Sequence, residues 1–96
     1  MDYEVVLTEP ARDDLHDIVD FIGQDNPQGA IIFRDGLIAE AETLVRFPYR
    51  GRLMRRRGNV RRLVYRSYLI LYRIIESRRT VEILRFWHGA RGTPRF

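Results

Sequence analysis

Residues 60–88 read VRRLVYRSYLILYRIIESRRTVEILRFWH and carry the strongest secondary-structure signal of the chain. Three runs rich in β-branched, aliphatic and aromatic residues occupy 60–65, 69–75 and 80–86. Short connections that contain Arg66-Ser67 and Ser77-Arg78-Arg79 join these runs, and connections this short favour antiparallel hairpins. The stretch therefore predicts a three-stranded antiparallel meander.

One strand and two helices are predicted ahead of the meander. Residues 3–7 form a short β-branched run, and Thr8 after it can cap a helix. Apolar residues recur at helical spacing over 11–22, and again after a second start signal, Asn26-Pro27, until about Phe47. Because only a few polar residues separate the two helices, we expect an antiparallel helical hairpin.

These elements predict an α+β fold in which the helical hairpin covers one face of an antiparallel-rich sheet. At 96 residues the chain has room for one core, so 1–96 is expected to be a single domain with an irregular tail at 89–96. The basic segment 48–59 is predicted to be a loop. The chain has no cysteine, no long apolar stretch and an acidic N-terminus, so we expect a cytoplasmic protein without a signal peptide or membrane span.

The charges are divided between the two halves of the chain. Residues 1–45 contain 11 acidic side chains and two arginines, whereas residues 46–96 contain 15 arginines with Glu76 and Glu82. The resulting balances of −9 and +13 give the net charge of +4. A basic half of this kind predicts an anionic partner, either nucleic acid or an acidic protein segment. The alternative is that the two halves neutralise each other within one fold.

Both faces of the predicted meander are apolar, because side chains alternate across a strand. The middle run places Leu69, Leu71, Arg73 and Ile75 on one face and Ile70, Tyr72 and Ile74 on the other. The last run alternates Val81, Ile83, Arg85 and Trp87 with Glu82, Leu84, Phe86 and His88. The helices can cover only one face, so we expect a partner protein to cover the second, or alternatively the loop 48–59 or the tail.

Two groups of side chains could carry chemistry. His88 ends the last run near Arg85 and Arg91, where it could act as an acid or base on RNA while guanidinium groups hold the phosphate. The alternative is a hydrogen-bonded surface histidine at a strand end. The arginines at 55–57, with those at 61–62, form a basic patch suited to phosphate or to an acidic segment.

No motif supports a hydrolase, a kinase or a metalloenzyme. The chain lacks a glycine-rich phosphate loop, a Ser-His-Asp arrangement and a His-x-x-x-His pair. His16 is surrounded in sequence by Asp13, Asp14, Asp17 and Asp20, but these carboxylates are spread round the predicted helix. We therefore expect neither a metal nor a cofactor.

The order and spacing of several short motifs resemble the RelE/ParE toxin superfamily. The motifs are Phe47-Pro48-x-x-Gly51, Val60-Arg61-Arg62-Leu63, Tyr68-Leu69-Ile70-Leu71-Tyr72-Arg73-Ile74 and Val81-Glu82-Ile83-Leu84-Arg85-Phe86-Trp87-His88. The resemblance covers nearly the whole chain, because the leading strand and the helical hairpin also fit. It implies a bacterial toxin held inactive in a hetero-oligomer by a cognate antitoxin, whose acidic C-terminal segment would cover the second sheet face.

Within the superfamily the chain is most similar to ParE-type toxins, which poison DNA gyrase. RelE-type toxins, the ribosome-associated mRNA endoribonucleases, have a basic residue after the aromatic that opens the middle strand, and here Leu69 follows Tyr68. The tail also lacks the tyrosine or lysines that several of these nucleases use, although some use a histidine near the position of His88. The resemblance therefore implies a gyrase poison. A ribosome-dependent endoribonuclease is the alternative, and a non-toxic nucleic-acid-binding module is a third hypothesis.

Three sets of candidate site residues follow from the resemblance and the charge pattern. If the protein is a nuclease, the catalytic candidates are Arg62, Arg73, Arg85, His88 and Arg91. The candidates for target binding are Arg61, Arg62, Arg85, Trp87, His88 and Arg91. The candidates for antitoxin binding are Arg55, Arg56, Arg73, Leu69, Leu71 and Ile83.

Overall fold

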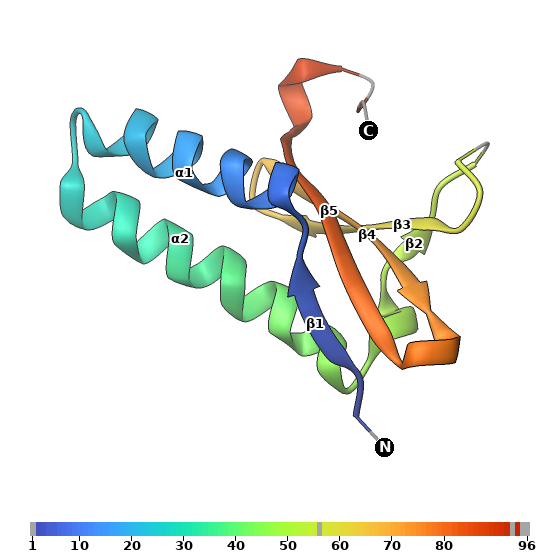
Figure 1. The fold of residues 1–96 in the computed structure, drawn as a ribbon. Helices are drawn as coiled ribbons and strands as arrows, with labels where there is room; N and C mark the ends of the chain where they lie inside the picture. Colours follow the sequence, from blue (N-terminus) through green and yellow to red (C-terminus); the bar gives the residue numbers. More distant parts are fainter. Residues whose placement is uncertain (1, 56, 93, 95–96) are drawn as a thin grey trace.

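The computed structural model describes residues 2–55, 57–92 and 94. Figure 1 shows two helices packed together at one side of a twisted sheet. The elements are β1 (Glu4–Leu7), α1 (Glu9–Gly23), α2 (Pro27–Glu42), β2 (Arg52–Leu53), β3 (Val60–Tyr65), β4 (Tyr68–Ile75) and β5 (Thr80–His88). The predicted α+β fold, with its leading strand, helical hairpin and meander, is confirmed. Neither helix of the described residues combines the length and the apolar character needed to cross a membrane.

The sheet has the strand order β1-β5-β4-β3-β2. The meander of β3, β4 and β5 is antiparallel, as predicted, whereas β1 pairs in parallel with β5, from Glu4 opposite Thr80 to Leu7 opposite Ile83. The segment predicted to be a loop contains β2, which pairs antiparallel with β3. The sheet therefore has one more strand than the sequence predicts.

The buried side chain of Tyr72 holds the start of β2 in place. Its hydroxyl donates to Pro48 O at 2.7 Å and accepts from Gly51 N at 2.9 Å. A Cβ on Gly51 would collide with this hydroxyl, so a glycine is required at the point of contact. These contacts direct the chain along β3, and they explain why a segment of loop-like composition forms a strand.

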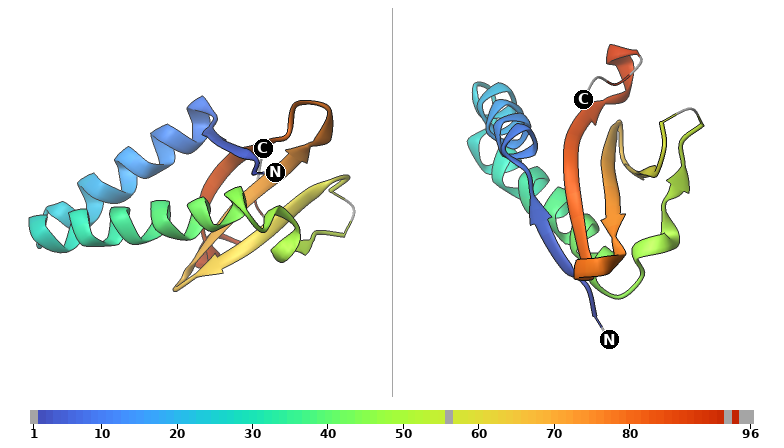
Figure 2. Two further views of the ribbon diagram at one scale, coloured as in Figure 1. Left: turned by 90° about the horizontal axis from the view of Figure 1, so that it is seen from below. Right: turned by 45° about the vertical axis from the view of Figure 1, so that its right-hand side comes forward.

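Both helices begin at the caps that the sequence predicts. Thr8 Oγ1 accepts from Ala11 N at 3.4 Å at the start of α1, and Asn26 Oδ1 accepts from Gly29 N at 2.9 Å at the start of α2. Each bond satisfies a backbone donor that has no partner within the helix. The two helices run in opposite directions from their connecting loop, and the left view of Figure 2 shows that they diverge toward the sheet.

The second helix ends earlier than predicted. The sequence predicts an end near Phe47, but α2 stops at Glu42 and a tighter 3-10 turn, Thr43–Val45, follows. The hydroxyl of Thr43 donates to Glu40 O at 2.6 Å, so a side chain binds a carbonyl of the last helical turn. This local competition with backbone hydrogen bonding accounts for the early end.

The core lies between the helical hairpin and one face of the sheet. It consists of Ala11, Leu15, Ile18, Leu37, Ala41, Leu44, Leu63, Ile70, Tyr72, Val81, Ile83 and Phe86. At Gly36 the α2 backbone lies so close to Tyr65 that a Cβ would meet the tyrosine hydroxyl. The loop between the helices lies well away from the sheet in Figures 1 and 2, and toward that end Phe21 and Ile32 are each 72% exposed.

Candidate functional site

The sheet face turned away from the helices, here called the outer face, combines an apolar centre with arginines. Val60, Leu71 and Trp87 are buried at the centre, and Met54, Leu69 and Leu84 pack against them. One row of cross-strand neighbours on this face runs Arg52, Arg62, Leu71 and Arg85, from β2 to β5. The outer face therefore offers positive charge beside apolar surface.

The chain's own tail and loop cover part of the outer face. Trp87 Nε1 donates to Gly92 O, and Arg57 donates to Pro94 O, each at 3.1 Å. The guanidinium of Arg91 lies 4.1 Å from the centroid of the Trp87 ring, which is 3% exposed. Of the two covers that the sequence left open, the intramolecular one is present. The burial of the apolar centre is thus explained without a partner.

A β-bulge changes the face on which the last residues of β5 lie. The pairing register between β4 and β5 shifts between Leu71 and Tyr72, which leaves Leu84 without a partner opposite it. As a result, Ile83 faces the helices while Trp87 lies on the outer face. The strict alternation predicted from the sequence, which puts these two side chains together, is wrong because the bulge inserts one extra residue between them.

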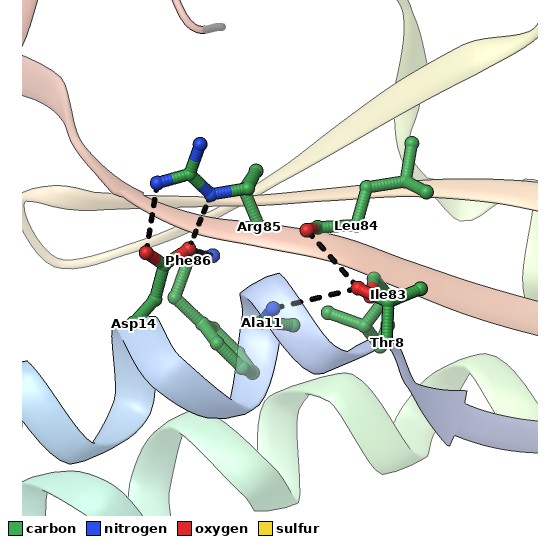
Figure 3. Close-up of polar contacts among 7 residues, drawn as sticks. All are labelled: Thr8, Ala11, Asp14, Ile83, Leu84, Arg85 and Phe86. Carbon is green, nitrogen blue, oxygen red and sulfur yellow. Dashed lines mark hydrogen bonds and ion pairs between the residues drawn. The ribbon is translucent and has the colours of Figure 1, made fainter. Parts of the chain in front are cut away.

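Asp14 of α1 binds the strand just after the bulge (Figure 3). Its carboxylate accepts from Arg85 Nε at 2.6 Å, from Arg85 Nη2 at 2.8 Å and from Phe86 N at 3.0 Å. Asp14 is 8% exposed, and the hydrogen bond to it raises the pKa of Arg85 above its ordinary value. A planar guanidinium that donates twice to one carboxylate is a strong, orienting contact. Arg85 is therefore part of the seam between α1 and β5.

Thr8 continues this seam along the edge of β5. Its backbone N donates to Ile83 O at 3.0 Å, and its hydroxyl lies 2.8 Å from Ile83 O and 3.2 Å from Leu84 O (Figure 3). These contacts begin where β1 ends, so the edge of β5 passes from a strand partner to a helix partner. The bulge thus lies where the edge changes partner.

His88 faces the helix side of the sheet. Its ring meets the Tyr68 ring edge-on at 4.8 Å between centroids, and its Nδ1 accepts from Ala90 N at 3.2 Å. Both rings border a cleft of about 320 Å³ against α1, lined by Asp14, Asp17, Ile18, Phe21, Tyr68, Phe86, His88 and Arg91. Burial raises the pKa of the Tyr68 hydroxyl above its ordinary value, and the charge of Arg91 opposes this effect. The cleft thus contains an imidazole, a phenol, a guanidinium and carboxylates.

The structure does not bring the candidate catalytic residues together. Arg85 is bound to Asp14, and Arg73 Nε donates to Glu82 at 2.8 Å. Arg91 shares the cleft with His88 but also stacks on Trp87, whereas Arg62 lies on the outer face of β3. The five groups therefore lie in separate environments on both faces of the sheet.

The other candidates for target binding are also engaged within the fold. Arg61 donates to Gly51 O at 2.9 Å, and its guanidinium lies 5.0 Å from the centroid of the Tyr49 ring. Trp87 is buried under the tail. Of this set, Arg62 alone has a side chain with neither a hydrogen bond nor a ring contact among the described residues.

The candidates for antitoxin binding divide by exposure. Leu71 and Ile83 are 0% exposed, and Ile83 faces the helices, so neither side chain offers surface to a partner in this conformation. Leu69 is half-buried on the outer face, and Arg55 is exposed beside β2. Arg56 lies outside the described residues.

Asp14 is a positioning residue that reasoning from the sequence missed. It resembles a solvated carboxylate when it is grouped with its acidic neighbours. Its spacing of three residues from Ala11 and four from Ile18, however, places it on the buried side of the helix. That spacing is the signal that could have identified it as a partner for a basic group on the sheet.

A family model described as the ParE toxin of type II toxin-antitoxin system, parDE, matches residues 5–92. No curated protein matches the chain significantly. Among solved structures, the toxin–antitoxin complex RelBE2 from Mycobacterium tuberculosis is similar at 31% identity and a TM-score of 0.72, over 92% of this chain and 99% of that one.

Two further structures share the fold at lower identity. The chromosomal ParDE TA system from P. aeruginosa matches at 19% identity and a TM-score of 0.78, over 90% of this chain and 95% of that one. A mutant of E. coli toxin RelE in the free state matches at 15% identity and a TM-score of 0.70, over 96% and 88%. Since the family model spans all the secondary structure described above except the first residue of β1, the chain belongs to the ParE family of toxins of type II toxin–antitoxin systems.

Proposed function

We propose that this protein arrests bacterial growth by poisoning DNA gyrase in the cytoplasm. We further propose that a cognate antitoxin with an acidic C-terminal segment neutralises it in a hetero-oligomeric complex. Membership of the ParE family supports the first statement. The arginines of the outer face support the second, because exposed guanidinium groups favour an anionic partner.

One observation carries the choice of gyrase over RNA, namely the dispersal of the nuclease candidates. Cleavage of RNA needs an acid, a base and a cation arranged around one phosphate. Here Arg73 and Arg85 are bound to carboxylates, and Arg62 lies on the opposite sheet face from His88. This arrangement favours a toxin that acts by binding over one that acts by catalysis.

A supercoiling assay with purified gyrase tests the proposal. We expect the protein to inhibit supercoiling of relaxed plasmid, and we expect no cleavage of mRNA on purified translating ribosomes. Ribosome-dependent cleavage together with unaffected supercoiling at high toxin excess would reject the gyrase target.

A ribosome-dependent endoribonuclease is the second candidate. It is favoured by the cleft in which His88, Tyr68 and Arg91 meet. Asp17 in the same cleft has no ion pair among the described residues, so it opposes the approach of a phosphate. This candidate predicts that His88→Ala abolishes growth arrest while antitoxin binding persists. The gyrase proposal, in which His88 is one of several candidate contacts with the target, predicts that the variant inhibits supercoiling more weakly but does not lose inhibition.

A nucleic-acid-binding module without toxicity is the third candidate, and the surplus of positive charge is what favours it. It predicts an affinity for duplex or single-stranded DNA that falls steeply as salt rises, because bound cations displace counterions from the phosphates. Titration at two salt concentrations measures this slope. A flat response, or no binding, excludes the module.

A further inference from the structure

Two arginines face each other across β2 and β3. Arg52 is paired in register with Arg62, so both side chains project from the outer face at neighbouring positions. No carboxylate within the described residues forms an ion pair with either guanidinium. Like charges directly opposite each other destabilise a strand pair. The fold therefore retains a repulsion that a bound anion would relieve.

The pair lines an open groove of about 650 Å³ at the rim of the sheet. The lining residues are Arg52, Leu53, Met54, Arg55, Arg57 and Arg62. None of them is acidic, so the whole groove attracts anions. Leu53 is 50% exposed and Met54 is half-buried, so the groove also presents apolar surface between its charges.

This mixture of groups favours a peptide over a nucleic acid. Binding of single-stranded nucleic acid draws on aromatic rings that stack with bases. Among the residues that the structure describes, the groove lining contains no aromatic side chain, and Trp87, on the same sheet face, is covered by the tail. A chain of carboxylates with interspersed aliphatic side chains, in contrast, matches both the arginines and the apolar surface.

We propose that this groove binds an extended acidic peptide segment. Arg52 and Arg62 together bind its carboxylates, and an aliphatic side chain of the segment lies against Leu53 and Met54. Two guanidinium groups that repel each other in the free protein then share anionic partners, so binding adds attraction and removes repulsion. Binding of an acidic peptide to this groove does not depend on the proposed function. The identification of that peptide as a segment of the antitoxin does rest on it.

Arg52→Glu is the variant that tests the proposal most directly. The new carboxylate would face Arg62 across the strands, so it should stabilise the free protein while blocking the site. Arg12→Glu is the matched control. It makes the same change of net charge at an exposed position of α1 that has no ion pair among the described residues.

The probe is a synthetic Glu-rich peptide of about 12 residues with one central leucine, long enough to extend over about 40 Å. Calorimetric titration at low salt should show binding that Arg52→Glu weakens at least about tenfold, the effect of losing one charge-assisted contact. Arg12→Glu should change the affinity less than about twofold. Thermal unfolding should show a melting temperature for Arg52→Glu that is equal to or above that of the unmodified protein, which establishes that the variant is folded.

Three results would overturn the proposal. They are equal peptide affinity in Arg52→Glu and the unmodified protein, equal loss in both variants, and tighter binding of an oligothymidylate than of the peptide. A version of the peptide with Gln for Glu should not bind, and inorganic phosphate should compete only weakly. The titration uses neither gyrase nor ribosomes. Peptide binding without inhibition of supercoiling therefore contradicts the proposed target alone, and inhibition without peptide binding contradicts the groove alone.

Discussion

The row of side chains that crosses the outer face has arginine at both ends, and the two ends differ. At the β5 end, Arg85 donates twice to the buried carboxylate of Asp14. At the other end, Arg52 and Arg62 face each other without a carboxylate among the described residues. Arginine therefore joins the helix layer to the sheet at one end of the row. At the other end its side chains have no ion-pair partner among the described residues. An arginine that binds a carboxylate of its own fold is structural, whereas one without such a carboxylate can bind another molecule.

Removing Asp14 should produce the largest change in stability, because it removes the carboxylate that binds Arg85. Asp14→Ala leaves the Arg85 guanidinium and the Phe86 N–H without their acceptor in a largely closed seam. We expect the free energy of unfolding to fall by about 3 kcal/mol. Chemical denaturation measures the change.

Asp14→Asn is the control for that experiment. The amide oxygen can still accept from Phe86 N, so the loss should be smaller than in Asp14→Ala. If both variants unfold at the same denaturant concentration as the unmodified protein, the contact with Asp14 does not stabilise the fold. Arg85 would then not differ from Arg52 and Arg62 in its contribution to stability.

Tyr72→Phe should have the next largest effect, because Tyr72 holds the backbone that presents Arg52. The change removes the acceptor of Gly51 N and the donor to Pro48 O, both buried, and should cost about 2 kcal/mol. Acidic-peptide binding should weaken as well, because β2 loses its anchor. Unchanged stability would mean that the start of β2 does not depend on this hydroxyl.

The pH dependence offers a second readout of Tyr72. Burial raises the pKa of its hydroxyl above the ordinary value of 10.0. The folded protein therefore holds this proton more tightly than the unfolded chain. The associated stability should be fully present below about pH 10 and should decline as the pH rises toward the folded pKa. Tyr72→Phe should show a shallower alkaline decline in denaturation experiments at increasing pH.

Arg62→Gln should have the smallest effect and the opposite sign. It removes the repulsion with Arg52, so the free protein should gain between about 0 and 0.5 kcal/mol. Raising NaCl from about 0.05 to 0.5 M should stabilise the unmodified protein slightly, because salt screens exposed charges. The variant should respond less. A loss above about 1 kcal/mol would place Arg62 among the structural arginines.

The sequence predicts the elements well where the signal is local. Thr8 and Asn26 are helix caps that depend on residues three positions away, and the meander depends on short connections. The parallel pairing of β1 with β5 and the strand β2 depend on contacts between distant residues. The hydroxyl of Tyr72 fixes β2 from about 20 residues away, as the bonds to Gly51 and Pro48 show.

The candidate site is less predictable, for the same physical reason. The bulge at Leu84 moves Trp87 to the opposite face from Ile83, and a strict period of two cannot reveal it. Whether an arginine is free depends on a carboxylate elsewhere in the chain. Arg85 finds Asp14 71 residues away, whereas Arg62 finds none among the described residues. Composition identified the basic half but did not show which of its charges were available.

The layered arrangement also separates charge in space. Acidic side chains are concentrated on the two helices, and Arg52, Arg62 and Arg73 project from the opposite side of the sheet. The molecule therefore has an electric dipole that runs from one layer to the other. An anionic chain in solution would turn the protein toward it before contact, which raises the rate of encounter at low ionic strength. The two-layer fold thus orients the protein toward an approaching anionic chain, in addition to forming the hydrophobic core.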